Sequence, residues 1–139
     1  MGALRATELA RYGMIGVGEI YRLFASGELD ADDEVAMVFD QSDFSPISDP
    51  LVNIRIALDK ALLAKIISKE TKKLFLEQSQ SLYFPERTFK GALALLEGRI
   101  PEEEWIALHA FHSTAPDAKR SDAIQLLKEM KSYLDTLNA

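Results

Sequence analysis

Apolar residues recur with helical spacing along most of this chain. Residues 4–11 read as the interior of a helix, and Gly13 supplies the stop, because glycine takes the left-handed conformation at a helix end without penalty. In residues 19–26 the large apolar side chains fall at i, i+3 and i+4, and Gly27 follows them. The pattern therefore predicts two short helices at the start of the chain.

The middle of the chain predicts longer helices. Almost every position of residues 51–67 is apolar, which is typical of a central helix covered on several sides, and Ser48 is placed to cap it. Ser68 is expected to cap a further helix that runs to about Leu82.

Proline and glycine positions predict two further helices and a break. A helix is expected from Pro85 to Gly98, and another from Pro101, carrying Trp105. Residues 113–122 read as a linker-like break.

Beyond that break, apolar residues are spaced 4, 3, 4 and 3 apart. They are Ala123, Leu127, Met130, Leu134 and Leu137. This stripe suits packing along another helix. Burial against the same chain is the interpretation that we favour, and docking of a partner is the alternative.

One segment departs from the helical pattern. Residues 34–39, EVAMVF, contain β-branched and aromatic residues that allow a short strand, although the same residues suit a helix. Residues 40–48 read as a loop. We predict a mainly α fold, with a single helical domain of six or seven helices over residues 1–139 and at most one short strand.

Composition and charge narrow the function. The 139 residues include no cysteine, which excludes disulfides, thiolate metal sites and cysteine nucleophiles. No apolar run has the length of a membrane span, and no basic stripe with interleaved aromatic residues is present. We therefore expect a cytoplasmic protein that binds neither membrane nor nucleic acid. The chain has a net charge of −6, and residues 28–49 carry eight acidic and no basic side chains. This acidic segment is either a solvated turn or a surface for a basic partner.

No motif makes a self-sufficient active site. The glycines of residues 13–18 follow the order G-x-x-G-x-G after a helix, whereas a dinucleotide site needs G-x-G-x-x-G after a strand. DADDE lacks the glycine and glutamate of a calcium loop. His109 and His112 share one helix face but have no evident third ligand, so they are expected to be surface or core histidines. We expect no metal and no cofactor.

Several polar side chains stand in apolar surroundings. Arg5 and Glu8 are three residues apart and suit a local pair, and Arg55 and Asp59 are helix neighbours. Asn53 lies within an apolar segment, where a buried amide needs hydrogen-bond partners, and Arg87 lies at a predicted helix start. The helix dipole does not favour a cation at a helix start, so the charge of Arg87 is expected to go to an acid or an anionic partner. Structural ion pairs are the interpretation we favour for these residues.

The same residues carry a family resemblance. MGALRATELARYGMIGVGEIY, DDEVA, SDPLVNIRIAL and FPERTF occur in this order over residues 1–96 and resemble the TfuA-like proteins. We therefore divide the domain into a TfuA-like region, residues 1–98, and a C-terminal helical extension, residues 99–139. Members of the family have an α/β half whose last strand leads through a serine into this first helix. The resemblance implies a fragment, a late start codon or a naturally split protein.

The resemblance also implies a function. TfuA-like proteins accompany YcaO-type enzymes in forming thioamides on peptide backbones, where the YcaO enzyme uses ATP to phosphorylate an amide oxygen. The TfuA-like protein would help to bring the sulfur donor, a sulfur carrier protein, or to release sulfide. The matching motifs implicate Arg5, Glu8, Asp32, Asp33, Glu34, Asn53, Arg55 and Arg87. Relatives place a histidine after DDEVA where this chain has Phe39.

Two other functions stay open. One is a fragment of a thiocarboxylate hydrolase, with Arg5 and Arg55 stabilising an oxyanion. The other is a helical interaction module that binds a partner through the C-terminal stripe. We do not expect the chain to be catalytic on its own. An apolar face of Leu4, Leu9 and Ile15 is expected to drive self-association.

Overall fold

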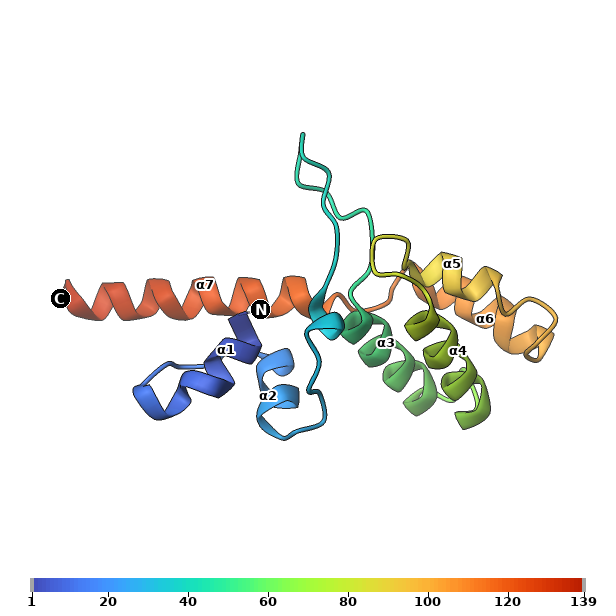
Figure 1. Ribbon diagram of the computed structural model, residues 1–139, viewed down its shortest axis with the longest axis horizontal. Coiled ribbons are helices and arrows are strands. Elements are labelled where there is room, and N and C mark those ends of the chain that lie inside the picture. The colour runs from blue at the N-terminus through green and yellow to red at the C-terminus, as the bar shows by residue number, and fades with distance from the viewer. Residues whose placement is uncertain (1, 139) are drawn as a thin grey trace. The chain divides into compact units, whose positions relative to one another are not determined.

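The computed structural model describes residues 2–138, and this part of the chain is mainly helical, with seven α-helices and no strand (Figure 1). The predicted fold class is therefore confirmed. The helices form two compact units. Residues 2–32 and 117–138 make the first unit, and residues 33–116 make the second.

The first unit contains three α-helices and one 3-10 helix. They are α1 (Gly2–Leu9), the 3-10 helix η1 (Ala10–Tyr12), α2 (Glu19–Ala25) and α7 (Ala118–Leu137). α1 packs on α2, and α2 packs on α7. Gly13 adopts a φ of 90° directly after η1, as predicted for the stop of the first helix, and Gly27 has a φ of 78° shortly after α2. Met1, which precedes α1 in the sequence, lies outside the described residues.

The carboxylate of Asp122 caps α2 from α7. Its two oxygens accept hydrogen bonds from the backbone N–H groups of Glu19 and Ile20, at 2.9 and 2.8 Å. Gly18 precedes these residues with a φ of 96°, and a Cβ there would lie 2.2 Å from the Asp122 carboxyl carbon. Glycine is therefore required for this approach, and the segment with three glycines is a corner between helices, as expected.

The second unit contains four α-helices around one core. They are α3 (Leu51–Leu63), α4 (Lys69–Ser81), α5 (Phe89–Ala94) and α6 (Glu102–His112). Each packs on the next in chain order. The core consists of Ile54, Ala57, Leu58, Ala61, Ile67, Phe75, Phe89, Ala92, Leu93, Leu96, Ile100 and Leu108. α3 buries seven of its thirteen residues, which fits the central helix predicted from its apolar sequence.

Two of these helix starts are capped across the unit. The hydroxyl of Ser68 accepts a bond from the Thr71 N–H, which confirms the predicted cap of α4. Glu104 of α6 accepts from the Ser68 N–H at 2.9 Å. Asp49 accepts from the Phe89 N–H at 2.8 Å, within the first turn of α5.

Several predicted boundaries are wrong. Ser48 does not cap α3: Pro50 is the N-cap, and the Ser48 hydroxyl accepts from the Val38 N–H at 2.9 Å. α3 ends at Leu63 rather than at residue 67. α5 starts four residues after Pro85, with Thr88 as its cap.

The linker-like break is also shorter than predicted. It ends at Asp117, which caps α7 through the Arg120 N–H, so the later part of the predicted break is helical.

The short strand that the sequence of residues 34–39 allows is absent from the described structure. The 3-10 helix η2 (Asp32–Val35) includes the first two of these residues, and Phe39 forms an isolated antiparallel bridge with Pro46. The loop predicted after it is confirmed. Asp40 and Asp43 accept hydrogen bonds from the N–H groups of Ser42 and Ser45, two residues on in each case, so the carboxylates stabilise a turn rather than a ladder.

The burial predicted for the C-terminal stripe is wrong. Leu127, Met130, Leu134 and Leu137 are each more than half exposed on α7, and Ala123 is exposed as well. α7 contacts α2 near the N-terminal end of α7, where Asp122 caps α2. The alternative, docking of another helix, stays open for the stripe.

Asp122→Ala should loosen α2. The change removes both acceptors at the helix start, and loss of such a cap costs about 1–2 kcal/mol. Hydrogen exchange at the amides of Glu19 and Ile20 should become faster. Asp135→Ala removes an exposed carboxylate from the same α7 and is the matched control; equal acceleration in both variants would contradict the capping role.

Candidate functional site

Two successive carboxylates of η2 bind two arginines of the second unit. Glu34 and Arg55 form the first pair. Arg55, from the second turn of α3, donates from Nη2 to Glu34 Oε1 at 2.5 Å and from Nε to Oε2 at 3.3 Å. The Glu34 side chain is 8% exposed and that of Arg55 27%. This two-point geometry fixes the guanidinium plane, which a lysine in its place would not do.

Asp33 and Arg87 form the second pair. Arg87 Nη2 donates to Asp33 Oδ2 at 2.6 Å, and Nη1 donates to the Asp33 carbonyl at 3.3 Å. Arg87 also donates to the carbonyls of Ser79, at 3.0 Å, and Leu82, at 3.2 Å. Its side chain is 2% exposed, so a buried cation joins η2 to the C-terminal end of α4. The charge of Arg87 thus goes to an acid, one of the two partners that the sequence predicted.

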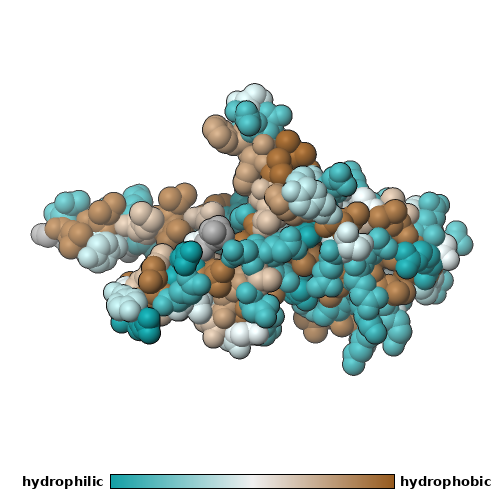
Figure 2. All heavy atoms as spheres, viewed as in Figure 1, coloured by the Kyte–Doolittle hydropathy of each residue, from teal (hydrophilic) through white to brown (hydrophobic). Residues whose placement is uncertain are grey.

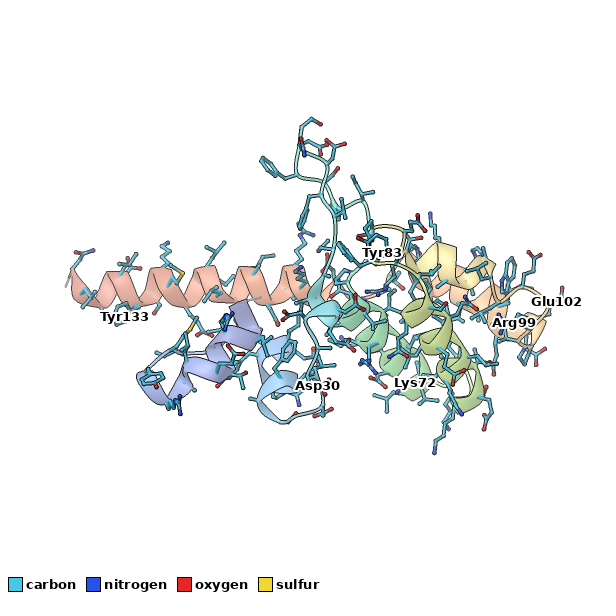
Figure 3. All side chains as sticks on the ribbon, viewed as in Figure 1. Asp30, Lys72, Tyr83, Arg99, Glu102 and Tyr133 are labelled. Atoms are coloured by element: carbon cyan, nitrogen blue, oxygen red, sulfur yellow. The ribbon has the colours of Figure 1, made fainter. Side chains whose placement is uncertain are left out.

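The helix neighbours Arg55 and Asp59 of α3 each form an ion pair, which agrees with the favoured interpretation of structural ion pairs, but they do not pair with each other. Arg55 turns to Glu34, and Asp59 binds the ammonium group of Lys72 on α4 instead (Figure 3 labels Lys72). Sequence reasoning missed Lys72. No local signal identifies it, since several lysines occupy the same short segment.

Arg55 also lines an open hollow between α3 and α4. The hollow has a volume of about 460 Å³ and is lined by Arg55, Leu62, Lys69, Lys72, Lys73, Leu76, Glu77 and Gln80. Four cations and one carboxylate make this lining positive, although Glu34 and Asp59 offset two of the charges. Such a surface suits an anionic group attached to an apolar chain, because Leu62 and Leu76 offer apolar contacts beside the cations.

The remaining candidate residues lie elsewhere. Arg5 and Glu8 form the predicted local pair at 2.5 Å on the exposed side of α1. Asp32 is exposed, and Asn53 is half-buried on α3. Of the eight candidate residues, four therefore meet in two ion pairs of the second unit, and Arg5, Glu8 and Asp32 belong to the first unit.

The two histidines of α6 pack on aromatic rings. The His109 ring lies 4.2 Å from that of Trp105, and the His112 ring lies 4.9 Å from that of Phe89, between centroids. Burial lowers the pKa of His112 below its ordinary value, and the charge of Asp49 raises it in part. No three metal-ligating side chains gather anywhere within residues 2–138.

Arg87→Met should destabilise the second unit by about 3 kcal/mol, because it leaves Asp33 without its cation and removes the hydrogen bonds that Arg87 donates to three backbone carbonyls. Urea unfolding followed by the fluorescence of Trp105 measures the change. Arg99→Met is the control: Arg99 is exposed and bonds Gln78, so its loss should cost below about 1 kcal/mol. Similar losses in both variants would contradict the structural role of Arg87.

His112 should make the second unit less stable in mild acid. Its folded-state pKa lies below the unfolded value of about 6.5, so the unfolded chain binds more protons and stability falls as the pH drops below 6.5. Unfolding measured between neutral pH and the onset of carboxylate titration should show this slope, and His112→Gln should flatten it. A slope abolished by His109→Gln instead would contradict the assignment.

The comparisons with known proteins agree with the motifs. The family model of the TfuA-like proteins matches residues 1–88, a segment that contains all eight candidate residues and both arginine–carboxylate pairs. No curated protein matches the chain. None of the described helices combines the length and apolar content that a membrane crossing requires. Since the matched segment is more than half of the 139 residues, the chain belongs to the TfuA-like family, which is associated with YcaO-type enzymes and, at the level of the family, with an accessory role in thioamide formation.

Proposed function

We propose that this protein assists a YcaO-type enzyme in the ATP-dependent formation of a thioamide on a peptide backbone. The family match over residues 1–88 is the observation that carries the proposal. In this scheme the YcaO enzyme transfers a phosphoryl group from ATP to an amide oxygen. The sulfur donor is a sulfur carrier protein. Water cleaves the C–S bond of the carrier thiocarboxylate to release sulfide and leave a carboxylate. Sulfide then attacks the activated carbon, and the oxygen leaves as inorganic phosphate, so that C=S replaces C=O. The present chain either recruits this carrier or aids the release of sulfide from it.

The hollow between α3 and α4 is the surface we assign to the sulfur donor. A thiocarboxylate at the end of a carrier protein is an anion on a peptide chain, and the lining offers cations together with Leu62 and Leu76. Arg55 is the one candidate residue of the described chain that lines this hollow, and Glu34 fixes its guanidinium. Arg55 would hold the anion, and Lys69 and Lys73 would strengthen its attraction.

A reconstituted reaction tests the role. It contains a YcaO-type enzyme, ATP, magnesium and a substrate peptide, and mass spectrometry detects exchange of oxygen for sulfur. With a carrier thiocarboxylate as donor, we expect thioamide only when this chain is present. With excess free sulfide, we expect the YcaO enzyme to need the chain much less. Equal product with and without the chain, for both donors, would refute the proposal.

Charge reversal tests the hollow itself. Lys69→Glu combined with Lys73→Glu should raise the KM for the carrier about tenfold or more, because each lost attraction and new repulsion weakens anion binding. The KM for the peptide should stay unchanged. Lys60→Glu combined with Lys90→Glu makes the same change in charge at two exposed positions outside the hollow and is the control. A carrier KM that rises equally in the control would assign the effect to overall charge.

The second candidate function is an interaction module without a catalytic part. The exposed stripe of α7 favours it, since more than half of the area of each of its large apolar side chains Leu127, Met130, Leu134 and Leu137 faces solvent. The two functions are compatible, because α7 lies outside the segment that matches the family.

A further inference from the structure

α7 carries a continuous apolar face that its own unit leaves uncovered. Seven large side chains are 42–65% exposed: Ile124, Leu126, Leu127, Met130, Tyr133, Leu134 and Leu137. α7 runs on past α2 over this stretch in Figure 1, and Figure 2 shows hydrophobic residues along it. Exposed apolar faces of this size usually mark interaction surfaces.

The spacing of this face is that of a helix built to pair with another helix. Leu127, Met130, Leu134 and Leu137 occupy alternating a and d positions, and Leu126 and Tyr133 flank them at g. The opposite side carries Gln125 and Ser132, both polar. The face therefore points to a helical occupant rather than to a small ligand or a membrane.

We propose that the occupant is α7 of a second copy of this chain, paired antiparallel about a two-fold axis near Leu127 and Met130. Such a pairing lets the same patch cover itself, as an isologous interface requires. With this axis, Arg120 of each copy lies level with Leu137 of the other. Antiparallel helices also oppose their dipoles.

The exposed area of the face is close to the area that a specific dimer buries. A fully exposed residue of this size presents on the order of 200 Å². Complete covering of the seven residues would remove at most roughly 700 Å² from solvent for each copy, slightly below the about 800 Å² for each partner of a typical specific interface. This inference does not depend on the sulfur-transfer role.

Sedimentation analysis over a range of concentrations tests the interface. Leu127→Lys with Leu134→Lys places two charges on the face, and Gln125→Lys with Ser132→Lys places the same charges, equally spaced, on the opposite side. The wild type and the second variant should be dimers, and the first should sediment with half their mass at unchanged helix content. A monomeric wild type, an assembly beyond a dimer, or a first variant that still dimerises would overturn the proposal.

Crosslinking tests the orientation, because the chain has no cysteine of its own. Arg120→Cys and Leu137→Cys are made as separate single variants. In the antiparallel pairing, oxidation should link the two variants when they are mixed and neither one by itself. Efficient linking of Leu137→Cys with itself would indicate parallel helices and overturn the arrangement.

Discussion

The second unit depends on a buried cation. Arg87 lies almost fully out of solvent, where an unpaired guanidinium would be very costly, and the fold supplies Asp33 and three backbone carbonyls to it. These partners come from η2, which precedes α3, and from the C-terminal end of α4. The bonds of Arg87 therefore hold these two segments together. Glu34 follows directly and binds Arg55, which means that placing Asp33 also places the carboxylate beside the hollow. A structural pair and a candidate binding residue are thereby coupled.

Three further acidic residues bind the N–H groups at helix starts in place of an arginine. The first N–H groups of a helix lack partners within it, and carboxylates satisfy them best because the helix dipole adds to the hydrogen bond. Here the carboxylates come from distant segments: Asp122 serves α2, Asp49 serves α5 and Glu104 serves the start of α4. Much of the acidic excess of residues 28–49 is explained by such internal bonds and by turns, so it is a weaker indicator of a basic partner than the composition suggested.

Local sequence was sufficient for those features that local physics decides. The αL glycine at Gly13, the Ser68 cap and the apolar circumference of α3 each follow from a few neighbouring residues, and each is confirmed. The features that failed depend on distant partners. Ser48 has a side chain suited to capping, but its hydroxyl accepts a hydrogen bond from the Val38 N–H instead. Arg55 and Asp59 are helix neighbours, but their partners, Glu34 and Lys72, come from other segments. For Arg87 the need for an acid could be predicted, whereas its identity, 54 residues away, could not.

The positions of these features along the chain argue for two separate tasks. The arginine–carboxylate pairs and the cationic hollow lie in the second unit, and the pairs lie within the segment that the family model matches. α7 lies beyond that segment, and none of its described residues takes part in the two arginine–carboxylate pairs. α7 carries the exposed apolar face and the Asp122 cap for α2. A surface that recruits an anionic donor must stay open to solvent, whereas an apolar helix face is stable only when covered. The proposed donor surface and the proposed pairing helix therefore lie in different units, so that each can be altered by mutation without changing the residues of the other.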